Sequence, residues 1–223
     1  MAGRKTDKML FCTGIAPDKP LVYVLHGENG DLLIDTGTRL VLHQVDHWIR
    51  RNKFNIRWIF LTHGHFDHTW NARYFKQKYG AQVFLHEKDR SLFCLDEKRI
   101  LYPSSQKTRA ATKIANSLVA RTTAPFCKVD AFLTDTDTDF LRGLGFDADV
   151  VMLPGHTEGS MGILQGRALY AGDAVSAVNG DYFTARFGEN VQKIKETEEK
   201  IFALNPLVIG PGHGHIIINE RAF

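Results

Sequence analysis

Short apolar runs alternate with stretches of helical periodicity through the first half of the chain. Two of these runs flank a Gly-Glu-Asn-Gly turn at residues 27–30, a combination that predicts a β-hairpin. Apolar positions in the next segment recur at helical spacing, which predicts a helix that covers the hairpin. The expected elements are strands at residues 21–25, 32–34, 57–61 and 83–85 and helices at residues 40–49, 71–78 and 87–121, the last with a break at 102–104.

The second half repeats this alternation with more strands. No tandem repeat and no Pro/Ser-rich linker interrupts residues 1–223, so we expect a single domain. Strands in both halves with helices outside them predict a layered α/β (α+β) fold. The expected elements here are strands at residues 128–133, 149–153, 161–164, 168–171 and 207–209 and a helix at residues 190–204.

Composition is typical of a soluble globular protein. Hydrophobic residues make up 43% of the 223 residues and charged residues 24%, which allows a full core. The net charge of +3 is spread along the chain rather than gathered in one block. Such a mild excess argues against nucleic-acid binding and is compatible with a small anionic substrate.

The cysteines and the apolar segments predict a cytoplasmic protein. Cys12, Cys94 and Cys127 are far apart and odd in number, which argues against a disulfide framework. The N-terminal segment lacks the apolar core of a signal peptide, and no run approaches the roughly 20 apolar residues of a membrane span. We therefore expect a reducing, cytoplasmic location and no membrane partner.

Metal-binding side chains crowd into the segment Thr-His-Gly-His-Phe-Asp-His at residues 62–68, directly after the strand expected at 57–61. Three histidines and an aspartate this close would repel or desolvate one another unless something holds them. A glycine and then a metal-ligand residue also follow three later strands, at His156, Asp173 and His213. Because functional sites are often built from loops at one end of a rigid sheet, we expect these side chains to meet.

Spacing divides these residues between two metal positions. In an extended segment residues i and i+2 point to the same side, so His63 and His65 can bind one ion together. Imidazole ligands favour zinc or iron, and both positions stay open for water. The predicted ligands are His63, His65 and His156 for the first ion, Asp67, His68 and His213 for the second, and Asp173 as a bridge between them.

The ligand pattern resembles that of the metallo-β-lactamase-fold hydrolase superfamily, in its glyoxalase II-like or lactonase-like branch. The resemblance rests on H-x-H-x-D-H at residues 63–68, P-G-H at 154–156, G-D at 172–173 and P-G-H-G at 211–214. The segment Leu-Leu-Ile-Asp-Thr-Gly is similar to the superfamily's first motif, whose aspartate, here Asp35, supports the site without binding metal. The resemblance implies a four-layer αββα sandwich with the metals at one edge of the two sheets.

The resemblance also implies hydrolysis by two divalent metal ions. Zinc is the expected metal, and iron and manganese accept the same ligands. Two cations that share one water lower its pKa enough to give a bridging hydroxide near neutral pH, and a metal then stabilises the developing oxyanion. The resemblance assigns Asp67 the catalytic role of orienting this hydroxide and passing its proton to the leaving group.

Departures from individual branches narrow the substrate to a small ester, thioester or lactone. The Asp67-His68 pair is similar to the glyoxalase-like and lactonase-like branches, and zinc β-lactamases usually lack that histidine. The chain stops ten residues after His213, without the C-terminal helical domain of true glyoxalase II. Ser176 occupies the position where homoserine-lactone lactonases carry a tyrosine. Two alternatives stay open, a mononuclear iron sulfur dioxygenase and a metal-stabilised binding protein without turnover.

The segment at residues 87–121 is expected to cap the metal edge. It carries basic residues that can receive an anionic substrate, and further candidates follow the bridging aspartate. A solvated basic helix face explains the same residues equally well. These candidates are Lys107, Arg109, Lys113, Tyr182 and Arg186.

Overall fold

The computed structural model describes residues 10–12, 20–178 and 181–219, and its first sheet comes from the N-terminal half. This sheet has the strand order β1-β2-β3-β4-β5-β7. β2 and β3 form the expected antiparallel hairpin, and β3, β4, β5 and β7 are parallel to one another. The strands are β1 (Leu10–Cys12), β2 (Val22–Gly27), β3 (Gly30–Ile34), β4 (Ile56–Phe60), β5 (Gln82–His86) and β7 (Ala131–Leu133).

The second sheet comes from the C-terminal half, with the order β14-β13-β10-β9-β8, and β11 pairs with β10. Its strands are β8 (Asp149–Met152), β9 (Met161–Gln165), β10 (Ala168–Val178), β11 (Asp181–Thr184), β13 (Val208–Gly214) and β14 (Ile217–Ile218). All neighbouring strands are antiparallel except β10 and β13, which run parallel. A separate two-stranded ribbon joins β6 (Tyr102–Pro103) to β12 (Phe187–Gly188).

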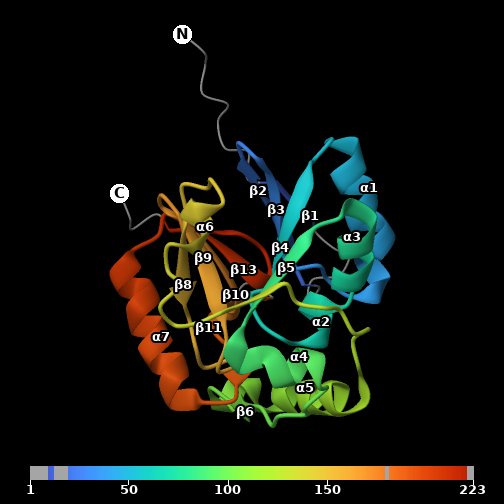
Figure 1. Cartoon of the computed structure of the whole chain (residues 1–223). Helices are drawn as coiled ribbons and strands as arrows, with labels where there is room; N and C mark the ends of the chain where they lie inside the picture. Colours follow the sequence, from blue (N-terminus) through green and yellow to red (C-terminus); the bar gives the residue numbers. More distant parts are fainter. Residues whose placement is uncertain (1–9, 13–19, 179–180, 220–223) are drawn as a thin grey trace.

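Helices cover the outer faces of both sheets (Figure 1), which gives the expected four-layer αββα sandwich. On the first sheet these are α1 (Leu42–Arg51) and α3 (Ala72–Tyr79), and on the second α7 (Val191–Leu204). The helices α4 (Arg90–Cys94) and α5 (Arg109–Arg121) lie at one end of the sandwich, at the bottom of Figure 1. The remaining helical segments are η1 (Arg39–Val41), α2 (Phe66–Thr69), η2 (Glu87–Asp89), η3 (Gln106–Thr108) and α6 (Phe140–Gly143).

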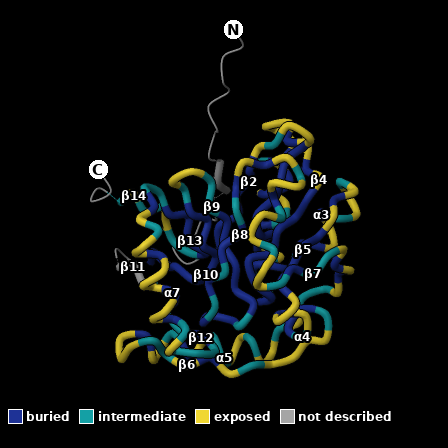
Figure 2. The backbone as a smooth tube through the Cα atoms, turned by 60° about the vertical axis from the view of Figure 1, so that its left-hand side comes forward, coloured by how far each residue is buried: buried dark blue, intermediate teal, exposed yellow. Residues whose placement is uncertain are grey.

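Three apolar clusters hold the layers together. Leu33 and Ile59 on the outer face of the first sheet pack with Val45 and other α1 and α3 residues. The facing sides of the two sheets share a second cluster, to which Phe60 and Ile163 belong. A third cluster joins the second sheet to α7. Figure 2 shows the buried backbone concentrated in the two sheets, with exposed positions on the outer helices. The nearly continuous apolar runs of these strands therefore supply buried residues to both faces of a sheet.

The structure corrects several expected boundaries. The segment at residues 87–121 is not one interrupted helix, because only α4 and α5 are α-helical and residues 95–105 run without a helix. Strands β10 and β13 extend well beyond the apolar runs 168–171 and 207–209 that predicted them. No helix among the described residues is long and apolar enough to span a membrane. The organisation of residues 1–223 as one domain stays a prediction.

Candidate metal centre

All seven predicted ligand residues meet at one edge of the two sheets. Their ligand atoms form three overlapping groups, and within each group these atoms lie within 4.8 Å of one another. One group matches the predicted first position and another the predicted second position, while the third connects them. The groups are His63, His65 and His156; Asp67, His68 and His213; and His63, His68 and Asp173.

The segment after β4 brings four of these residues together, although not in the extended form that the i, i+2 argument assumed. Residues 62–64 form a bend, and His65 precedes the first turn of α2. The imidazole rings of His63 and His65 still lie 4.9 Å apart between centroids. A helical turn then carries Asp67 and His68 to the neighbouring position. The grouping was predicted correctly, but the local geometry that produces it was not.

Asp173 and His213 lie inside strands rather than after strand ends, which corrects the sequence-based placement. The parallel pairing of β10 with β13 shifts register around Gly172, whose φ of +51° is in the left-handed region that favours glycine. This irregularity lies immediately before Asp173. Across the strand pair, a Cβ atom on Gly212 would lie 1.9 Å from Oδ1 of Asp173. The position therefore requires glycine for the carboxylate to lie where it does.

The carboxylate of Asp173 lies between the two predicted metal positions. Its Oδ2 is 3.4 Å from Nε2 of His156, which belongs to the first group. Its Oδ1 is 3.1 Å from Nε2 of His68 and 3.5 Å from Nε2 of His213, which belong to the second. One oxygen thus faces each group, as a bridging ligand requires.

Hydrogen bonds orient His63 and His68 so that their Nε2 atoms face the centre. The carboxylate of Asp35 accepts from the hydroxyl of Thr62 at 2.8 Å, so the same hydroxyl oxygen can accept from Nδ1–H of His63 at 3.1 Å. Asp35 also accepts from Nδ1–H of His68 at 2.8 Å. Asp35 therefore supports the site as the sequence predicted. Such outer partners fix the tautomer and the ring orientation of ligand histidines.

The buried nitrogens fit a bound cation. His156 donates its Nδ1–H to the carbonyl of Phe187 at 2.8 Å, which leaves Nε2 as an acceptor facing the centre. Nε2 of His63 is buried and has no hydrogen-bond partner among the described residues. Nδ1 of His65 approaches Nε2 of His156 at 2.9 Å. Buried polar atoms without partners are costly, and a metal ion among these nitrogens would satisfy them.

Electrostatics distinguishes the two groups. Burial, and then the neighbouring imidazoles, lower the pKa of His63 well below its ordinary value and lower that of His65 to about 3. In the second group burial acts in the same direction, but the carboxylates of Asp173 and Asp67 outweigh it and raise the pKa of His213 to about 9. At neutral pH His63 and His65 are therefore deprotonated and ready to bind a metal, whereas a metal at the second position must displace the proton of His213.

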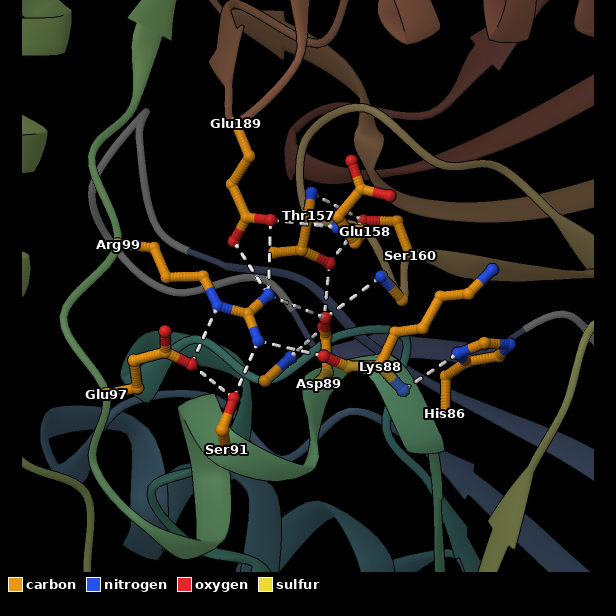
Figure 3. Close-up of polar contacts among 12 residues, drawn as sticks. His86, Lys88, Asp89, Ser91, Glu97, Arg99, Thr157, Glu158, Ser160 and Glu189 are labelled. Atoms are coloured by element: carbon orange, nitrogen blue, oxygen red, sulfur yellow. Dashed lines mark hydrogen bonds and ion pairs between the residues drawn. The ribbon is translucent and has the colours of Figure 1, made fainter.

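Asp89 is a supporting residue that the sequence analysis missed. Its fully buried carboxylate accepts from the backbone N–H of Gly64 at 2.8 Å and from the hydroxyl of Thr157 at 2.7 Å. It also accepts from the N–H of Gly159 at 2.9 Å. Figure 3 shows this carboxylate with Thr157 on one side and Arg99 on the other. No local pattern marks Asp89, because its partners lie 25 to 70 residues away in the sequence.

Arg99 connects this network to β12 and its neighbourhood (Figure 3). Its guanidinium donates to both carboxylate oxygens of Glu189, at 3.2 and 3.3 Å, and lies 3.9 Å from Oδ1 of Asp89. Glu189 in turn accepts from the backbone N–H of Glu158 at 3.0 Å, and its own N–H donates to the carbonyl of His156. The segment that follows α4 therefore braces the His156 loop.

A cavity of about 370 Å³ opens onto the centre. Its lining contains five of the seven ligand residues and an apolar wall from α5, together with Arg186. Arg109 and Lys113 line a different cavity, and Lys107 lines neither, so the structure does not bring these expected anion-binding residues to the centre. The side chain of Tyr182 lies outside the described part of the chain.

The sequence of this chain is similar to those of known metal-dependent proteins. A family model for the Metallo-beta-lactamase superfamily matches residues 15–213. The hydroxyacylglutathione hydrolase GloC of Haemophilus influenzae is 28% identical over 176 residues, which cover 72% of this chain and 69% of that protein.

Solved structures share the fold. The structure of TTHA1623 in a di-iron-bound form superposes with a TM-score of 0.67 at 20% identity and covers 94% of both chains. The BLEG-1 B3 metallo-beta-lactamase superposes with a TM-score of 0.65 at 21% identity, over 93% of this chain and 92% of that one. At these identities the likeness is one of fold.

Proposed function

Because the chain belongs to the metallo-beta-lactamase superfamily, we propose that it is a hydrolase that uses two divalent metal ions to cleave a small ester, thioester or lactone. Most members of this superfamily are hydrolases, and a GloC relative at 28% identity agrees with that class. The proposed ligands are the seven residues of the centre, namely His63, His65, Asp67, His68, His156, Asp173 and His213.

The position of Asp173 carries the proposal for two ions rather than one. A carboxylate that binds a single ion needs to contact only one group of imidazoles, whereas a bridging carboxylate contacts both. Here Oδ2 of Asp173 faces His156 and Oδ1 faces His68. Three imidazoles at one position and an aspartate with imidazoles at the other suit zinc, and iron and manganese accept the same donors.

Asp67 is the proposed proton carrier. When bound, two cations would lower the pKa of a shared water so that it loses a proton near neutral pH. They would also stabilise negative charge on the carbonyl oxygen. The carboxylate of Asp67 is partly open to solvent, and its Oδ2 is 3.3 Å from Nε2 of His213. It lines the cavity, so it can accept a proton from the attacking water and deliver it to the departing group.

The proposed reaction balances as an ordinary hydrolysis. The water oxygen forms a bond to the acyl carbon, and the bond from that carbon to the sulfur or oxygen of the leaving group breaks with its electron pair. The leaving group takes one proton from Asp67, and the other product is a carboxylic acid. No oxidant or reductant is needed.

Metal analysis combined with turnover tests the proposal. We expect two equivalents of divalent metal per chain and hydrolysis of at least one member of a panel of small esters, thioesters and lactones. His63→Ala should lose one equivalent of metal and lose turnover. One iron per chain with oxygen uptake on a persulfide would support the dioxygenase alternative instead, and bound metal without any turnover would support a binding protein.

A further inference from the structure

One wall of the cavity at the metal centre is apolar and comes from α5. Its residues follow one another at helical spacing along a single face. At 1.5 Å per residue, the face is about 12 Å long. The lining residues from this helix are Ala111, Ile114, Ala115, Leu118 and Val119.

This apolar face is unusually exposed for large aliphatic side chains. Ile114 is 63% exposed and Leu118 is 50% exposed, although both line the cavity. The same helix is anchored along a neighbouring side, since Thr112 is buried and Asn116 accepts from the backbone N–H of Leu101 and donates to its carbonyl. The helix is therefore fixed in place with its apolar face directed at the cavity.

The cavity continues without a break from this face to the metal ligands. Phe66 and Phe187 line it together with Leu101 and α5. The carbonyl of Phe187 holds the ring of His156, so the apolar wall begins at a metal ligand. Ser176 and Arg186 supply the polar lining outside the ligand residues among the described part of the chain. A group that lies against α5 therefore meets hydrocarbon, whereas a group at the other end meets the metal ligands.

We propose that the substrate is an ester or thioester with an unbranched apolar acyl chain, that this chain lies along the α5 face of Ala111, Ile114, Ala115, Leu118 and Val119, and that its carbonyl carbon lies at the metal centre. The inference rests on the proposed hydrolase function and names its substrate class. Covering Ile114 and Leu118 with an acyl chain removes apolar surface of both partners from water, which supplies the binding free energy. A polar acyl group of the same length finds no partners on this wall.

A series of thioesters that share the same leaving group tests this acyl-binding face in the metal-loaded protein. From acetyl through butanoyl, hexanoyl and octanoyl to decanoyl, KM should fall by up to about fourfold for each methylene that becomes buried. The double variant Ile114→Ser/Leu118→Ser should flatten this dependence. Phe202→Ser, which removes another exposed apolar side chain on α7, should leave the dependence unchanged. Equal KM values across the series in the unmodified protein would overturn the proposal.

Binding of product acids separates this inference from the proposed function. Calorimetry of the metal-loaded protein should show decanoate binding at least tenfold more tightly than acetate, with the preference lost in the double variant. If no thioester is hydrolysed but this preference holds, the hydrolase proposal is wrong and the proposal of an acyl-binding face is supported. If hydrolysis proceeds but decanoate binds no better than acetate, only the proposal of an acyl-binding face is wrong. If the protein is a dimer that Leu118→Ser converts to monomers, the face contacts a second copy of the chain. This result would also overturn the proposal of an acyl-binding face.

Discussion

The backbone N–H of Gly64 donates to the buried carboxylate of Asp89 at 2.8 Å. Gly64 separates His63 from His65, and the same carboxylate accepts from Thr157, which follows His156. One side chain between the two halves therefore positions all three ligands of the first metal position. It acts through backbone and hydroxyl donors, without binding the metal itself.

Asp89→Asn should destabilise the protein by about 2–5 kcal/mol, because the new amide N–H₂ faces donors that then lack an acceptor. It should also weaken metal binding at the first position. Chemical denaturation and competition with a chelator measure the two effects. Asp135→Asn, at an exposed carboxylate, is the matched control and should change neither. A fully stable Asp89→Asn protein with unchanged metal affinity would contradict this role.

Asp35→Asn should weaken metal binding at the second position by about 10–100-fold, as loss of an outer partner of a ligand histidine typically does. Asp35 has a positive φ of 58°, which asparagine tolerates, so the backbone should persist. The reason for the loss is that an amide has one acceptor oxygen, whereas the carboxylate accepts from the Thr62 N–H at Oδ1 and from the Thr62 hydroxyl and Nδ1–H of His68 at Oδ2. Stepwise metal titration should show one tight and one weakened site, and two tight sites would refute the expectation.

Gly212→Ala should displace the carboxylate of Asp173, since the added Cβ would lie 1.9 Å from its Oδ1. We expect loss of at least one equivalent of metal and a reduction in turnover of at least 100-fold, with the fold retained. Gly143→Ala is the control, because a Cβ there meets open space and its φ is not positive. Elemental analysis and circular dichroism distinguish loss of metal from loss of fold. Full metal content in Gly212→Ala would show that the carboxylate does not bridge.

The metal-free protein should lose stability as pH rises from about 6.5 through 9. The pKa of His213 is raised to about 9 in the folded state, so its stabilising contribution is complete below the unfolded value of 6.5 and disappears as the folded group deprotonates. The loss should amount to a few kcal/mol at most. The Tm of the metal-free protein against pH measures it, and His213→Gln should show a smaller decline. An identical decline in the variant would mean that another group is responsible.

The affinity for metal should also depend on pH, and differently at the two positions. A bound cation requires the imidazole of His213 without its second proton, so the affinity of the second position should rise with pH up to about 9. The first position should fill at lower pH, because the pKa of His65 is about 3. Metal titrations at pH 6 and pH 8 would check this order. Equal affinity of both positions at pH 6 would contradict it.

Periodicity was sufficient for most of the fold. The two apolar runs and the turn within residues 21–34 predicted a hairpin, and the helical spacing at 40–49 predicted a covering helix, and the structure contains both. The same reasoning failed at 87–121, because residues 95–105 are held by long-range contacts rather than by a local pattern. The bond from Asn116 to Leu101 is one such contact. The short strands β1, β6, β11, β12 and β14 were also missed, since two to four residues carry little periodic signal.

The sequence by itself determined which residues would gather at the candidate metal centre. Their side chains are of metal-ligand type, and four of them lie within residues 63–68, so chemistry and local spacing were enough. Only the tertiary structure decided how Asp173 and His213 reach the centre from within strands, that Asp89 braces it, and that α5 gives its cavity an apolar wall. The physical reason is that ligand chemistry belongs to single residues, whereas the bracing hydrogen bonds and the cavity wall exist only after two sheets from distant parts of the chain have packed together.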